Sequence, residues 1–102
     1  MTENEFNDTQ RVLTESGLAV ESAHYNRASF GSWTITAATT PRLRIVWDGK
    51  ERVLVVQQET PEFFNGLPVW QDLWIARDSA QQTPENALRA IHANTTSCLT
   101  HA

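Results

Sequence analysis

The side chains that could carry out acid–base or nucleophilic chemistry are few and scattered in this sequence. Apart from dispersed Ser, Asp and Tyr residues they are His24, His92, His101 and Cys98. The sequence contains no Gly-x-Ser-x-Gly turn, phosphate-binding loop or dinucleotide-binding glycine pattern. His24, next to Tyr25, is a candidate general acid or base, but a solitary histidine in a loop is usually incidental. We therefore expect no catalytic residues and no cofactor.

One segment brings metal-binding side chains close together in the sequence. His92, Cys98 and His101 are ligands that suit zinc. They number only three and lie on the C-terminal tail, whereas a structural zinc site takes four ligands. We therefore expect no metal site.

Tryptophan is the residue type that points to binding, because the chain holds four tryptophans in 102 residues and tryptophan is enriched at interfaces. Trp33 and Trp47 each alternate with apolar neighbours, so we expect both in the core. If Val69 to Arg77 forms a strand, Leu73 and Ile75 face the core. Trp70, Asp72 and Trp74 then face outward on one side. A helix over the same residues is the alternative, and we favour the strand.

Two aromatic rings beside a carboxylate suit a cationic partner, through cation–π contact and a charge-assisted hydrogen bond. We therefore take Trp70, Asp72 and Trp74 as candidate partner-binding residues. The alternative is that they form a second apolar sheet face, covered by Phe63, Phe64 or the first helix.

Charge is segregated along the chain although the net charge is only −4. Residues 1–21 carry −4, residues 22–58 carry +3 and residues 59–102 carry −3. The acidic candidates for binding a basic partner are Glu3, Glu5, Asp8 and Glu15. The basic candidates lie on the central hairpin: Arg42, Arg44, Lys50 and Arg52. The alternative for these four basic residues is that they only keep an exposed hairpin soluble.

The elements that must position these residues follow from capping residues, periodicity and turn signals. Asn7 or Asp8 can cap a first helix that ends at Gly17. We expect mostly coil from Val20 to Phe30. The alternation from Ser32 to Thr39 is typical of a half-buried strand.

A hairpin follows, in which Leu43 to Trp47 pairs with Arg52 to Gln58. The signal for its turn is Asp48-Gly49. A loop from Asp48 to Glu51 would put Trp47 opposite Arg52 and Ile45 opposite Leu54, which keeps apolar residues on one face.

The last third of the chain begins with a predicted single helical turn from Thr60 to Gly66. The strand Val69 to Arg77 comes next. Thr83-Pro84-Glu85 then opens a final helix with Leu88 and Ile91 on its apolar face.

These elements predict one two-layer α+β domain over residues 1–102. An N-terminal helix and a C-terminal helix cover an antiparallel sheet of three to four strands with a central hairpin. We expect residues 1–6 and 95–102 to fray. Residues 1–10 are acidic and polar, no segment is apolar enough for a membrane helix, and one cysteine allows no internal disulfide. From these features we expect a cytoplasmic location.

The leading functional hypothesis is a small acidic binding protein without catalysis. We envisage an inhibitor of a basic enzyme such as a toxin nuclease, of the bacterial immunity type or phage-encoded. The first alternative is a small-molecule binder or small enzyme with a pocket lined by Trp47, Trp70 and Phe63 or Phe64. The second is a weak nucleic-acid binder that uses the basic hairpin. A homodimer is a further possibility.

Overall fold

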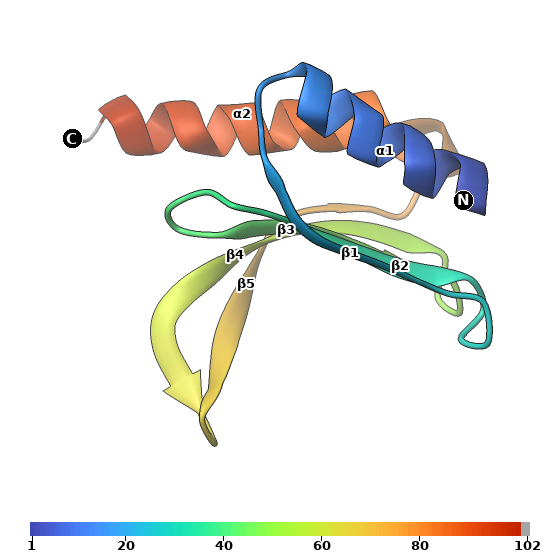
Figure 1. Ribbon diagram of the computed structural model, residues 1–102, viewed down its shortest axis with the longest axis horizontal. Helices are drawn as coiled ribbons and strands as arrows, with labels where there is room; N and C mark the ends of the chain where they lie inside the picture. Colours follow the sequence, from blue (N-terminus) through green and yellow to red (C-terminus); the bar gives the residue numbers. More distant parts are fainter. Residues whose placement is uncertain (101–102) are drawn as a thin grey trace.

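Two helices and a five-stranded antiparallel sheet make up the chain in the computed structural model, which describes residues 1–100 and the side chains of residues 1–93. The elements are α1 (Glu3–Glu15), β1 (Val20–Asn26), β2 (Ser32–Ala37), β3 (Leu43–Asp48), β4 (Val53–Phe64), β5 (Leu67–Ala76), a 3-10 turn η1 (Ser79–Gln81) and α2 (Pro84–Thr100). The strands lie in sequence order across the sheet. Both helices lie on the same side of it (Figure 1). The α+β prediction is thus confirmed, with five strands in place of three to four.

The N-cap of helix α1 lies five residues before Asn7, the earlier of the two predicted caps. Thr2 is the N-cap, and its backbone N–H donates to the Glu5 carboxylate in a capping box. Phe6 is buried, with its ring 5.6 Å from those of Tyr25 and Trp33. Aromatic packing and the cap therefore hold the first turn in place, where we had expected residues 1–6 to fray.

The segment predicted as coil contains strand β1. Ala23 and Tyr25 pair with Ile35 and Trp33 and share the core face with them. The pairing register shifts between Val20 and Ser22. Because such a bulge interrupts the alternation of period two, it hides the strand from a search for that pattern.

The central hairpin forms, but its register is two residues away from the one predicted. Trp47 pairs with Leu54 and Ile45 with Val56. A shift of two residues leaves every side chain on its predicted face, which is why the burial expected for Trp47 is confirmed.

The loop of this hairpin runs from Gly49 to Arg52, and it packs against the turn between β1 and β2. The Gly49 N–H donates to Ser32 Oγ at 2.9 Å. A Cβ at position 49 would lie 2.0 Å from the Phe30 carbonyl oxygen. Close backbone approach therefore requires glycine here.

The predicted helical turn from Thr60 to Gly66 is wrong, because β4 continues to Phe64 and turns directly into β5. Asn65 and Gly66 both have positive φ, 53° and 79°, as a two-residue type I′ hairpin turn requires. In Figure 1 the far ends of β4 and β5 bend away from the helices and project from the sheet. We call residues 59–70 the arm, and its residues Phe63, Phe64 and Leu67 the tip.

A bulge in β5 changes which tryptophans share a face. Val56 pairs with Trp74 while Gln57 pairs with Asp72, so Leu73 is an extra residue on β5. Trp74 consequently lies with Val56 on the core side, and Asp72 lies with Gln57 on the opposite side. The expectation that Trp70 and Trp74 share a face is therefore wrong.

The same bulge places Ile75 outside the core. Ile75 pairs with Val55 on the face away from the helices and is 42% exposed. Leu73 packs against the core cluster, as predicted.

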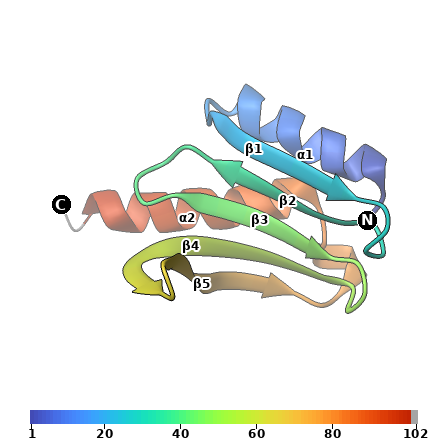
Figure 2. The same ribbon diagram turned by 60° about the horizontal axis from the view of Figure 1, so that its bottom comes forward.

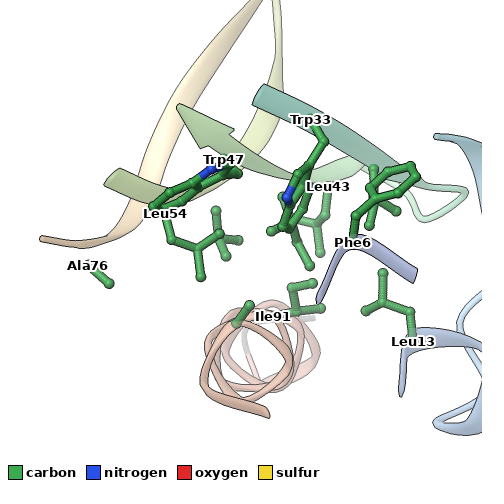
Figure 3. Close-up of a cluster of buried hydrophobic side chains, with 12 residues drawn as sticks. Phe6, Leu13, Trp33, Leu43, Trp47, Leu54, Ala76 and Ile91 are labelled. Atoms are coloured by element: carbon green, nitrogen blue, oxygen red, sulfur yellow. The ribbon is translucent and has the colours of Figure 1, made fainter. Parts of the chain in front are cut away.

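The core lies between the sheet and the two helices (Figure 3). Trp33, Leu43, Trp47 and Leu54 extend from the sheet toward Phe6 and Leu13 of α1 and Ile91 of α2. Trp33 and Trp47 are 2% and 3% exposed, so their predicted burial is confirmed.

Helix α2 starts where the sequence predicts and runs further. Thr83 Oγ1 accepts a hydrogen bond from the Asn86 N–H at 3.1 Å, which is the expected cap contact. The helix backbone continues through residues 95–100, which we expected to fray. No helix in the part of the chain that the structure describes is long and apolar enough to cross a membrane.

Candidate functional site

The sheet face turned away from the helices, seen from in front in Figure 2, is the open face. Side chains cross it in registered rows. One row is uncharged and mostly apolar, and we call it the apolar row: Thr34, Val46, Val55 and Ile75. The next row is polar and consists of Thr36, Arg44, Gln57 and Asp72. The polar row lies between the apolar row and the base of the arm.

Arg44 and Trp70 form the best-defined contact on this face. The Arg44 Cζ atom lies 4.0 Å from the centroid of the Trp70 ring, within cation–π range. Arg44 Nε donates to Gln57 Oε1 at 2.6 Å, and Gln57 Nε2 donates to Asp72 Oδ1 at 2.7 Å. Burial lowers the pKa of Arg44. Trp70 thus contacts an arginine of the same chain, and Gln57 links that arginine to Asp72.

Arg42 is neutralised by acids from two other strands. It donates to the carboxylates of Glu59 on β4 and Glu21 on β1, the latter at 3.1 Å. The hydrogen bonds with Glu59 and Glu21 raise the pKa of Arg42. Its Cζ atom is 5.8 Å from the Trp70 ring centroid. Arg42 therefore links β1, β3 and β4 beside the base of the arm.

The four bases of the hairpin do not form one strip. Arg42 and Arg44 lie at the start of β3, whereas Lys50 and Arg52 lie in the turn beyond its end. Strand β3 has six residues, which separates the two pairs by about 20 Å at the usual rise of a strand. The positive segment of the sequence is thus divided in space.

The acidic candidates belong to the other layer. Asp8 and Glu15 lie 3.8 and 3.1 Å from Arg11, and Glu3 lies 3.8 Å from Arg27. Glu5 is used by the capping box. The residues predicted to bind a partner therefore occupy three separate places: the carboxylates are on α1, Trp70 and Asp72 are on the open face, and Trp74 is on the core side.

The predicted tryptophan-lined pocket does not form. Trp47 is in the core, Trp70 is on the open face, and Phe63 and Phe64 are at the tip. Trp74 instead lines a cavity of about 330 Å³ against α2, together with Asn86 and Arg89.

A cleft of about 620 Å³ lies between the start of α1, the β3–β4 turn and the segment that follows β5. Arg52 and Arg77 line it together with Glu5 and Asp78. The charges of these four side chains balance, and the Met1 ammonium, 3.9 Å from the Glu5 carboxylate, also lies at the cleft.

The tip is the feature that the sequence analysis missed. Phe63, Phe64 and Leu67 are 70%, 72% and 68% exposed, although we had considered the two phenylalanines as a cover for the sheet. The signal that could have located them is Asn65-Gly66, which is a strong hairpin turn when apolar residues flank it. We had interpreted it as the end of a helix.

The described residues offer no cluster for a metal ion. No group of three or more His, Cys, Asp or Glu side chains within the described part of the chain could hold one. His24 and His92 are exposed. Of the candidate zinc set, the side chain of Cys98 and all of His101 lie outside the described residues.

Comparisons with protein-family models, with curated proteins and with solved structures found no match to this chain.

Proposed function

We propose that this chain is a non-catalytic protein-binding domain, and that its arm and open face contact the partner. The supporting observation is the tip, where three large apolar side chains are each about 70% exposed. Soluble proteins seldom leave such a cluster in water unless it marks an interaction site. Aromatic side chains are also frequent energetic centres of interfaces.

The charges of the arm favour a protein over a membrane or a nucleic acid. The ionisable residues of the arm are Glu59 and Glu62, both acidic. Anionic lipid headgroups and phosphates repel carboxylates and are bound by Lys and Arg. A protein surface with an apolar groove is the matching partner.

A second, separate proposal concerns helix α1, which lies on the opposite side of the sheet from the open face (Figure 1). Its exposed carboxylates Glu3, Asp8 and Glu15 outnumber its single arginine, Arg11. An acidic surface accelerates the encounter with a basic protein. An inhibitor of a basic enzyme, of the immunity type or phage-encoded, would present this helix to the enzyme.

Photo-cross-linking in the native cell tests the main proposal. A photoreactive phenylalanine analogue replaces Phe64, and the control carries it at Phe30. Phe30 is a matched control because it is 68% exposed but lies in the β1–β2 turn. We expect a discrete cross-linked protein from position 64 and none from position 30. Equal products at both positions, or none at position 64, would overturn the proposal.

A further inference from the structure

We propose that the partner of the arm is a second copy of this chain. Two copies would clasp face to face, with the tip of each arm packed on the apolar row of the other. The inference depends on the proposed function, since it names the protein that the arm binds.

The apolar row provides the receiving surface. Thr34 pairs with Val46, Val46 with Val55, and Val55 with Ile75, so these side chains form one line across four strands. Both helices lie on the other side of the sheet (Figure 1), and Ile75 is 42% exposed. A β-branched row of this kind offers a flat apolar surface to an aromatic side chain.

The arm and the apolar row lie on the same side of the molecule. The arm bends toward the side that the open face looks onto (Figure 1). The high exposure of Phe63 and Phe64 shows that the tip does not fold back onto its own sheet. Each copy therefore presents one apolar projection and one apolar surface. When two copies are related by a twofold axis, the tip of each copy packs on the apolar row of the other, so both tips and both rows are covered.

The apolar area available is about what a stable dimer needs. Three large side chains that are about 70% exposed offer roughly 400 Å² per tip. If each copy buries its tip and a similar area around its apolar row, it contributes roughly 800 Å², the usual share of one partner in a specific interface.

The charges on the open face do not oppose this approach. Arg42 is paired with Glu59 and Glu21, and the opposite charges of Arg44 and Asp72 lie close together, each hydrogen-bonded to Gln57 of the same chain. Two copies can thus meet without placing these groups, unpaired, against like charges.

Sedimentation equilibrium of the whole chain tests the inference. We expect the wild-type protein to sediment as a dimer. The double variant Phe63→Ser/Phe64→Ser should be monomeric, with a dissociation constant raised roughly 100-fold. Phe30→Ser is the matched control and should remain dimeric. Ile75→Lys, which changes the apolar row and leaves the tip intact, should also be monomeric. Because these side chains are exposed, circular dichroism should show the same fold for all variants.

Disulfide formation between copies tests the docking geometry. In a Cys98→Ser background, chains carrying Phe64→Cys are mixed with chains carrying Ile75→Cys and oxidised. We expect a mixed disulfide in excess of random pairing. The same mixture made with Phe30→Cys in place of Phe64→Cys should give random pairing alone.

The opposing outcomes separate this inference from the proposed function. A wild-type chain that stays monomeric up to roughly 0.1 mM would overturn the clasp. So would a dimer that survives both Phe63→Ser/Phe64→Ser and Ile75→Lys. If position 64 then cross-links to a different protein in the native cell, the proposed function stands and only the identity of the partner changes.

Discussion

Arg44 is partly buried in the sheet surface, where loss of hydration disfavours its charge and lowers its pKa. The Trp70 ring at 4.0 Å and the Gln57 oxygen at 2.6 Å replace the lost water. A cation–π contact gains strength as solvent is excluded. Arg44 and Trp70 therefore hold the base of the arm against β3.

A double-mutant cycle measures this contact. We expect Arg44→Ala and Trp70→Ala each to destabilise the fold, with a coupling energy of about 1 kcal/mol between them. Urea unfolding of the four proteins gives the value. The pair Arg11 and Trp70 is the control and should show no coupling, because Arg11 lies on α1. Purely additive effects of Arg44→Ala and Trp70→Ala would contradict the contact.

Gly49 and Gly66 show two different physical reasons why a position requires glycine. A Cβ at position 49 meets the Phe30 carbonyl oxygen at 2.0 Å, whereas one at position 66 meets nothing within 4 Å but has φ +79°. We expect Gly49→Ala to lower the free energy of unfolding by about 3 kcal/mol. Gly66→Ala should cost only about 1 kcal/mol. Chemical denaturation measures the loss of stability in each variant. Equal losses would show that the loop around Gly49 moves aside to make room for the added Cβ.

At the scale of elements, the sequence predicts the strands correctly where apolar and polar residues alternate without interruption. The strand from Ser32, the central hairpin and the capped start of α2 all follow from local pattern. Prediction failed at irregularities. Bulges in β1 and β5 add one residue and shift the alternation, and no periodic rule anticipates them. A two-residue error in the hairpin register did no harm to the predicted faces, whereas the single residue added at Leu73 did.

Deleting Leu73 tests the role of the β5 bulge. Without it, Trp74 can still pair with Val56 and Asp72 with Gln57, so the ladder becomes regular and these side chains keep their faces. We expect the deletion to keep the fold and to lower the melting temperature about as much as Leu73→Ala, because both variants lose the packing of the Leu73 side chain against the core. Thermal melts followed by circular dichroism compare the two variants. A much lower melting temperature for the deletion would show that the fold needs the bulge itself.

The start of α1 offers a test of the capping box. Glu5→Ala removes the acceptor for the Thr2 N–H and should cost about 1 kcal/mol of stability. Glu15→Ala is the control. Its exposed contact with Arg11 is worth little, and an acid is unfavourable near the end of a helix. Urea unfolding should show almost no loss for the control. A similar loss in both variants would contradict the cap.

At the scale of the whole molecule, charge that is segregated along the chain is mixed in space. The sequence shows a positive middle segment, but the fold brings Glu21 of β1 and Glu59 of β4 onto Arg42. The order of residues in the sequence could not show these ion pairs. Predicting them requires both the order of the strands in the sheet and the pairing register. The site was predictable in part. Trp70 and Asp72 do lie on the open face, whereas the tip depended on recognising the Asn65-Gly66 turn.

This mixing predicts weak interaction with nucleic acids. Arg42 is paired, and Lys50 and Arg52 lie at the other end of the hairpin, so few phosphates could be neutralised together. We expect no binding of duplex DNA or RNA by fluorescence anisotropy, even at low salt. A variant in which Glu21 and Glu59 are both glutamine restores a free arginine and serves as the comparison. Tight, salt-dependent binding by the wild-type chain would contradict the charge pairing.

Two of the sheet's irregularities are the bulges on β1 and β5, the outer strands of the sheet. An outer strand exposes backbone groups that could recruit another strand and start unlimited growth, as in amyloid. A bulge twists the strand and breaks the regular spacing that such recruitment needs. The bulges that make these strands hard to recognise in the sequence therefore also limit strand pairing at the sheet edges. This protects a small sheet protein from templated aggregation.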